Sequence, residues 1–156
     1  SLIDCFPSII EAVGGHLVEE DVDLPGKSIW EISQTSNQDR FAFSEYHAVG
    51  SENAIYMLRN RQYKYIYYVD DPVQLFDLQA DPAETQDLSN LPEYQEILQF
   101  FDEELSNIVD PEGVDAKAKE DQRSKISENG GEAKVRQRGA FDNSPVPGEN
   151  PVFRRH

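Results

Sequence analysis

The sequence contains a single cysteine and no apolar stretch that approaches the about 20 residues of a membrane-spanning helix. One cysteine, Cys5, excludes a disulfide within the chain and leaves the redox compartment open. No secretory signal peptide is visible, although this absence means little in a piece of a longer protein. The sequence therefore predicts a soluble chain with no membrane span, periplasmic or cytoplasmic, with the compartment left open.

Cations are also scarce, and most of them lie late in the chain. The first 113 residues carry five Lys and Arg against 23 Asp and Glu, a net charge of −18. Residues 114–156 carry nine against seven, a net charge of +2, and the whole chain has −16. So acidic a surface argues against nucleic-acid binding, because the phosphate backbone is itself negative. We expect an acidic body and a mildly basic tail that either stays solvated or docks on the body.

What the sequence does have is a dense run of Tyr, Ile and Val between residues 54 and 78, which suits the half-buried surface of β-strands. Asn60 and Arg61 separate two apolar runs closely enough for a tight turn, and Asp70-Asp71-Pro72 is a second turn signal. We expect an antiparallel meander of three strands, to which an alternating run upstream adds a fourth. The predicted strands are Phe41–His47, Ala54–Leu58, Tyr63–Val69 and Val73–Leu78.

Apolar side chains recur every three or four residues over Leu91–Val109, which predicts a long amphipathic helix. Asn90 and Glu93 have the spacing of a capping box at its start, and Asp110-Pro111-Glu112-Gly113 ends it. Its apolar face consists of Tyr94, Ile97, Leu98, Phe101, Leu105 and Ile108. The fold class that follows is α+β: a four-stranded antiparallel sheet with a long helix packed on one face, plus a partly helical C-terminal tail.

The first 35 residues have weaker patterns. Ser1–Val13 predicts a short helix with Asp4 as its N-cap, ended by Gly14-Gly15. This helix has an apolar face that needs something to pack on. Ser28–Ile32 predicts one helical turn with three inward-facing apolar side chains, Ile29, Trp30 and Ile32.

The tail combines helical and irregular stretches. Ala116–Glu128 and Glu132–Arg138 predict helices, whereas the three prolines within residues 143–151 exclude regular structure there. We expect the tail to be ordered in part, with Phe141 as the apolar anchor that holds it against this chain or a second copy.

Cys5 begins the stretch Cys5-Phe6-Pro7-Ser8, which resembles the nucleophile motif of the type I sulfatases. In that family the first residue, a cysteine or serine, is oxidised to formylglycine, and an arginine follows the small residue. Here Ile9 holds the arginine position and offers neither charge nor hydrogen-bond donors. We therefore interpret Cys5 as a buried structural cysteine and not as a nucleophile.

The order of five longer motifs resembles the C-terminal part of the type I, formylglycine-dependent sulfatases of the alkaline phosphatase superfamily. The motifs read DCFPSII, DLPGKSI, FSEYH, RNRQYKYI and LFDLQADPAE. Each is weak alone, whereas their order and spacing from Leu2 to at least Val109 are specific. They occupy Asp4–Ile10, Asp23–Ile29, Phe43–His47, Arg59–Ile66 and Leu75–Glu84.

The resemblance implies the C-terminal subdomain of a sulfuric ester hydrolase, which completes the fold and rims the active site. In the family, the formylglycine, the activating Lys and His residues and the calcium or magnesium ligands lie in a large N-terminal α/β domain. None of these has a match here, so we expect no catalytic residue, no metal ligand and no cofactor in this chain. Residues 1–38 would be the end of that missing domain with a connecting loop, residues 39–113 the C-terminal subdomain, and residues 114–156 its tail.

The implied partner is the missing N-terminal sulfatase domain, and self-association through an exposed apolar patch or the tail is a second possibility. Two other interpretations stay open. One is a piece of a phosphonate or phosphate ester hydrolase of the same superfamily, because the atoms that recognise the transferred group lie elsewhere. The other is a non-catalytic acidic module that binds a cationic partner.

His47, at the end of a predicted strand, is the candidate substrate-binding residue. Loops of this sheet border the active-site mouth in the family that the chain resembles, whereas an ordinary hydrogen-bonded histidine is the alternative. Asp70 and Asp71 offer too few ligands for calcium, and we interpret them as a solvated turn.

Two features of the central strands predict structural roles. Lys64 lies between aromatic residues on a strand, which favours an ion pair with a nearby carboxylate. The stripe of Tyr63, Tyr65 and Tyr67 on one strand face predicts packing in the core or at a domain interface.

Overall fold

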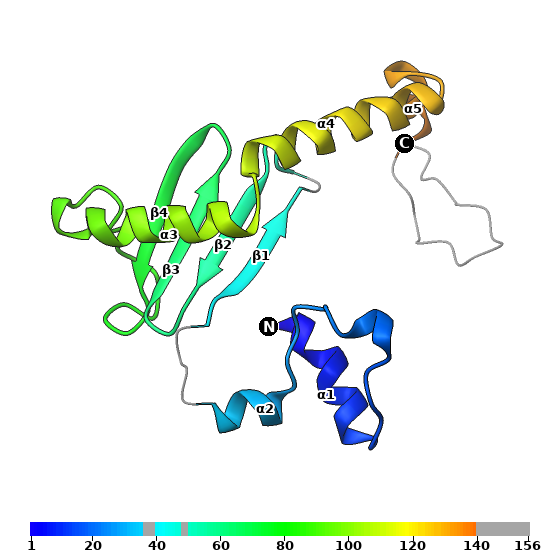
Figure 1. Cartoon of the computed structure of the whole chain (residues 1–156). Coiled ribbons are helices and arrows are strands. Elements are labelled where there is room, and N and C mark those ends of the chain that lie inside the picture. Colours follow the sequence, from blue (N-terminus) through cyan, green and yellow to red (C-terminus); the bar gives the residue numbers. More distant parts are fainter. Residues whose placement is uncertain (36–39, 48–49, 140–156) are drawn as a thin grey trace. The chain divides into compact units, whose positions relative to one another are not determined.

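The computed structural model describes residues 1–35, 40–47 and 50–139. The chain forms two compact units, Ser1–Val109 and Asp110–His156, which are considered separately below (Figure 1). Within the described ranges, no helix combines the length and the apolar character that crossing a membrane requires.

The first unit contains the predicted four-stranded antiparallel sheet, with the strands in the order β1-β2-β3-β4 (Figure 1). The tight turn between β2 and β3 is closed by Asn60, whose side-chain oxygen accepts hydrogen bonds from the backbone amides of Gln62 at 2.9 Å and Tyr63 at 2.7 Å. An asparagine side chain that binds the next backbone amides replaces strand pairing with a turn. The strands are β1 Ala42–Tyr46, β2 Ile55–Arg59, β3 Tyr63–Tyr68 and β4 Asp71–Asp77.

The turn before β4 lies earlier than the sequence predicts. We expected Asp70-Asp71-Pro72 to form the turn, but Asp71 and Pro72 already belong to β4. Asp70 makes the turn in the left-handed region, at a φ of 65°, which aspartate tolerates better than most residues. Pro72 is accommodated because β4 is an edge strand, where a missing N–H donor need not break a ladder.

Helix α3, Gln95–Ile108, lies across one face of the sheet (Figure 1). Its predicted apolar face is confirmed, since Leu98, Phe101 and Leu105 are buried. Phe101 is fully buried, with its ring 5.4 Å from that of Phe41 and 5.8 Å from that of Tyr65. The Tyr65 hydroxyl also donates a hydrogen bond to the Asp102 carboxylate, and burial raises the pKa of Tyr65 far above its usual value.

The predicted capping box of this helix is wrong. A 3₁₀ turn, η3 Pro92–Tyr94, precedes α3, and the N-caps of the two elements are Leu91 and Tyr94, neither with a side-chain capping hydrogen bond. The physical reason is Pro92, whose fixed φ starts the turn two residues after Asn90.

The two faces of the sheet differ in what covers them. Successive side chains of a strand point to opposite faces, so the pair Leu58 and Tyr65 lies under α3 and the pair Met57 and Ile66 lies on the other side. Leu58 and Tyr65 are buried, whereas Met57 and Ile66 are partly exposed. We call the side of Met57 and Ile66 the open face.

The N-terminal segment, residues 1–35, holds two short α-helices and two single 3₁₀ turns. Gly14, at a φ of 72°, ends the first helix as predicted. The prediction that the second helix turns its apolar side chains inward is wrong, because Ile29 is 56% and Trp30 42% exposed. The elements are η1 Leu2–Asp4, α1 Cys5–Ala12, η2 Glu19–Asp21 and α2 Ile29–Gln34.

The reason lies in how α2 is attached. The Ser28 hydroxyl caps α2 by accepting from the Glu31 amide at 3.2 Å, and the Ile29 amide donates to the Ser8 hydroxyl of α1 at 3.0 Å. Gly26 makes the close approach possible, because a Cβ there would lie 2.1 Å from the backbone oxygen of Ile3. The N-terminus of α2 therefore docks on α1 through polar groups and leaves its apolar side chains outside.

The second unit contains α4, Pro111–Glu128, and α5, Glu132–Arg138, which confirms the partly helical tail. Helix α4 begins five residues before the predicted Ala116, because the Asp110-Pro111 pair that ends one helix also starts the next. The Asp110 carboxylate accepts the Gly113 amide at 3.1 Å, and Pro111 occupies the first helical position. The expected anchor Phe141 lies outside the described residues.

Candidate functional site

His47, the predicted substrate contact, directly follows β1. Its ring meets the Tyr56 ring edge-on at 5.6 Å, and its Nε2 lies 3.5 Å from Oε2 of Glu45. The side chain is 24% exposed, yet both ring nitrogens are shielded from solvent and have no hydrogen-bond partner among the described residues. The ring is thus held by an aromatic contact while its polar atoms stay available.

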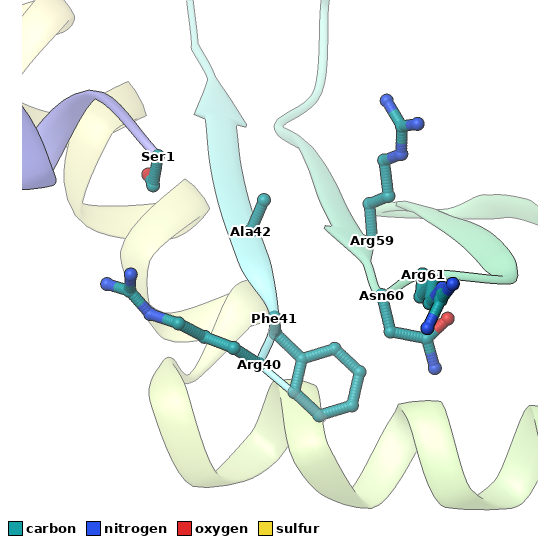
Figure 2. Close-up of a pocket in the computed structure, with 7 residues that line it drawn as sticks. All are labelled: Ser1, Arg40, Phe41, Ala42, Arg59, Asn60 and Arg61. Carbon is teal, nitrogen blue, oxygen red and sulfur yellow. The ribbon is translucent and has the colours of Figure 1, made fainter. Parts of the chain in front are cut away.

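A hollow of about 430 Å³ opens at the start of β1 and the end of β2 (Figure 2). It contains three of the five cations of the first 113 residues, Arg40, Arg59 and Arg61. The pairing of Ala42 with Arg59 across β1 and β2 brings these distant positions together. Its lining is Ser1, Arg40, Phe41, Ala42, Arg59, Asn60 and Arg61.

Arg40 is engaged by a buried carboxylate of the N-terminal segment. Its two terminal nitrogens lie 2.9 and 2.5 Å from the two oxygens of Asp4, which is only 4% exposed. The Lys27 amide donates to the same carboxylate at 3.0 Å, and the amine of Ser1 lies 2.7 Å from it. Burial alone would raise the pKa of Asp4, but the hydrogen bonds from Arg40, the amine and Lys27 hold it well below its usual value.

The LFDLQADPAE motif forms a loop whose carboxylates bind its own backbone. Asp77 accepts from the amides of Gln79 at 2.9 Å and Ala80 at 3.0 Å. A hydrogen bond from Gln62 is the main reason why the pKa of Asp77 lies below its usual value. The motif therefore has a structural explanation.

The same loop supplies the partner of Lys64. Its last residue, Glu84, stands at a φ of 55° and pairs with Lys64 of β3 at 2.5 Å. The predicted ion pair of Lys64 is confirmed. The tyrosine stripe is also confirmed as core packing, because Tyr65 is buried and both Tyr63 and Tyr67 pack against the core.

The described residues do not fit a metal ion. No three His, Cys, Asp or Glu side chains in these ranges lie close enough together to hold one, and Asp70 and Asp71 are both exposed. Calcium and magnesium take six or more oxygen ligands, so two exposed carboxylates in a turn are insufficient.

Cys5 corrects one prediction. It is exposed and not buried, because the buried side of α1 consists of Asp4, Pro7 and Ser8. Its neighbour in the motif, Ile9, is also exposed.

The hollow of three arginines is what the reasoning from sequence missed. Its residues are 19 or more positions apart in two groups, and strand pairing alone brings them together. The available signal was their rarity, since an acidic body with five cations has few ways to concentrate three of them.

Comparison with known proteins identifies the origin of this fold. Residues 1–110 match the family described as N-sulphoglucosamine sulphohydrolase, C-terminal. Arylsulfatase K of Danio rerio is 32% identical over 119 residues, which cover 70% of this chain and 22% of that protein. Choline-sulfatase of Rhizobium meliloti (strain 1021) is 30% identical over 125 residues, covering 78% and 24%.

Solved structures share the fold at lower identity. A putative sulfatase from Bacteroides thetaiotaomicron VPI-5482 superposes with a TM-score of 0.59 at 23% identity, covering 78% of this chain and 25% of that one. Phosphonate monoester hydrolase of Agrobacterium radiobacter gives 0.52 at 21% identity, covering 67% and 23%. The chain spans about a quarter or less of the length of these relatives. It belongs to the family of N-sulphoglucosamine sulphohydrolase C-terminal domains and is the C-terminal region of a sulfatase.

Proposed function

We propose that this chain completes the fold of a sulfatase and rims its active site, while the catalytic groups lie in the remainder of the enzyme. The observation that carries the proposal is the family match over residues 1–110 together with the small share of each relative that the chain covers. The formylglycine and the calcium or magnesium ligands belong to that remainder, and the chain alone hydrolyses no sulfate ester.

The N-terminal segment supports this proposal by the side chains that it exposes. Eleven large apolar residues between Leu2 and Trp30 have more than a third of their surface exposed. Isolated soluble domains seldom leave so much apolar surface uncovered, and such surfaces mark interaction sites. The eleven are Leu2, Ile3, Phe6, Ile9, Val13, Leu17, Val18, Val22, Leu24, Ile29 and Trp30.

The proposed partner for this surface is the α/β domain of the same enzyme. Residues 1–38 then form the end of that domain and a connection, residues 39–113 the C-terminal subdomain, and residues 114–156 its tail. In the chain alone, the same apolar surface would drive self-association.

His47 is the proposed contact with the substrate. Support comes from its two shielded ring nitrogens, which lack partners among the described residues and can bind a polar group of a ligand. His16, which lies exposed in the N-terminal segment, has no comparable setting.

A phosphonate or phosphate ester hydrolase remains the second candidate, favoured by the likeness to phosphonate monoester hydrolase. At 21% identity that likeness concerns the fold, which both kinds of enzyme share. The catalytic domain therefore decides between the two ester classes.

A chimera tests the proposal. The present chain replaces the matching C-terminal region of choline-sulfatase, and the product is assayed with choline sulfate beside the present chain alone. We expect hydrolysis by the chimera and none by the chain. In the chimera, His47→Ala should raise KM several-fold, whereas the control His16→Ala should leave KM unchanged.

Two outcomes would contradict the proposal. Hydrolysis of an aryl sulfate by the chain alone, lost in Cys5→Ala, would place a nucleophile in this chain. A chimera that melts cooperatively and yet shows no protection of residues 1–35 in hydrogen exchange would mean that this segment does not dock on the catalytic domain.

A further inference from the structure

We propose that the arginine hollow at the start of β1 and the end of β2 is an oxyanion-binding site, with Arg59 as its principal ligand and Arg61 as the second. The class of ligand is a sulfate or phosphate group. The proposal does not depend on the chain completing a sulfatase, because it concerns binding by this chain as it stands.

The first argument is the distribution of charge. The first 113 residues have a net charge of −18, so their average field repels anions, and a small anion can bind only where cations are concentrated. Three of the five cations line this one hollow. The remaining two are paired elsewhere, Lys27 with Glu31 at 3.3 Å and Lys64 with Glu84 at 2.5 Å.

The second argument is how the three arginines differ. Asp4 takes both terminal nitrogens of Arg40 and offsets its charge, so Arg40 forms a wall of the hollow and not its ligand. Arg59 is exposed, and the described part of the chain supplies no acceptor for its guanidinium. A guanidinium offers paired N–H donors that match two oxygens of a sulfate or phosphate.

The third argument is geometric. Figure 2 shows Arg40 and Arg59 extending to the same side of the sheet as Ala42, while Phe41 points the other way. Phe41 packs against Phe101 of α3, so the hollow opens on the open face, away from the helix. The methyl group of Ala42, opposite Arg59 in the strand pairing, leaves the space that a larger side chain would fill.

Arg61 adds the second charge from the turn. The turn is rigid, because the Asn60 side chain holds the amides of Gln62 and Tyr63. Arg59 and Arg61 are therefore carried by a fixed hairpin, which reduces the conformational entropy that anion binding would cost.

The experiment is a titration of the ¹⁵N-labelled chain with sodium sulfate at constant ionic strength, maintained with sodium chloride. We expect saturable shifts of the Arg59 Nε–H signal and of the amides of Ala42 and Asn60. Arg59→Gln should weaken binding about tenfold or more, since it removes a charged hydrogen-bond donor. Arg59→Lys should retain part of the affinity, because it keeps the charge and loses the paired donors.

The matched control is Lys27→Gln, which makes the same change in net charge on an exposed side chain of the N-terminal segment and should alter affinity less than about twofold. Parallel titrations with phosphate and acetate separate a tetrahedral anion from a planar carboxylate. Stronger binding of acetate than of either tetrahedral ion would overturn the assignment to sulfate or phosphate.

Three further results would overturn the proposal. Shifts that do not saturate, or that spread over the Lys and Arg residues of α4 and α5, indicate non-specific screening. Equal affinity in Arg59→Gln excludes Arg59 as a ligand. Loss of binding when extra residues precede Ser1, with Arg59 unchanged, would assign the effect to the terminal amine of this chain.

Discussion

The sheet with α3 and the N-terminal segment bury opposite kinds of residue. In the sheet and α3 the buried side chains are almost all apolar, from Ala54 to Leu105. In the N-terminal segment the four buried residues are Asp4, Pro7, Ser8 and Ser28, while eleven large apolar side chains are exposed. The first region is held by burial of apolar surface and the second by polar contacts.

This difference teaches which region can stand alone. Apolar burial stabilises in proportion to the area removed from water, and the sheet and α3 achieve it within their own residues. The N-terminal segment instead relies on the Asp4–Arg40 pair and the Ser8 and Ser28 hydroxyls, and it reserves its apolar surface. A segment built in this way is stable only in part without the surface that it faces.

The largest expected effect is in the apolar region. Phe101→Ala empties a fully buried ring site and should lower the free energy of unfolding by about 3–5 kcal/mol, measured by urea denaturation. The control Phe100→Ala concerns a neighbouring ring that is 47% exposed and should cost about 1 kcal/mol or less. A loss below about 1 kcal/mol for Phe101→Ala would show that α3 does not dock through this residue.

A smaller and local effect is expected in the polar region. Asp4→Asn removes the charge that holds Arg40 and should destabilise the N-terminal segment by roughly 1–3 kcal/mol. Hydrogen exchange should show faster exchange over Cys5–Ala12, with little change over β2 and β3. Asp23→Asn, an exposed residue of the same segment, serves as the control. Equal loss of protection in the sheet would mean that the two regions unfold together.

The pH dependence follows from the lowered pKa of Asp4. Because this pKa is lower in the folded state than the usual value of about 3.9, the charged form stabilises the N-terminal segment above about pH 4. The contribution is lost as the pH falls below 4 toward the folded-state value. Hydrogen exchange of α1 between pH 6 and pH 2.5 should show this loosening in the native chain and a weaker dependence in Asp4→Asn. The same slope in both would exclude Asp4 as the titrating group.

The smallest effect on stability is expected on the exposed apolar surface. Ile9→Ser changes an exposed side chain of α1 and should alter the free energy of unfolding by less than about 0.5 kcal/mol. It should nevertheless reduce the binding of a hydrophobic dye and the self-association seen in sedimentation. Unchanged dye binding would mean that the exposed side chains do not act as one surface.

Sequence reasoning predicted the regions where one local pattern dominates. Alternation of apolar residues located all four strands, and the three- and four-residue spacing located the buried side of α3. It failed at α2, where exposed Ile29 and Trp30 were expected inside, and at Cys5, which was expected to be buried. In both cases polar contacts to residues far along the chain oriented the helix.

The candidate sites show the same division. His47 was named from a motif, and the structure supplies its contact with Tyr56 without deciding its role. The arginine hollow could not be predicted, because Arg40 and Arg59 become neighbours only through the register of β1 against β2. Register depends on pairing between segments, which no local periodicity specifies.

The sequence by itself determined the α+β class, the strand order of the meander and the family, because residue periodicity, turn residues and motif order are properties of neighbouring positions. The tertiary structure decided which side of α1 is buried, how Asp4 meets Arg40 across 36 positions, and where three rare arginines gather. These depend on non-local contacts, in which one ion pair or one strand pairing outweighs the preference of a short helix for burying its apolar side.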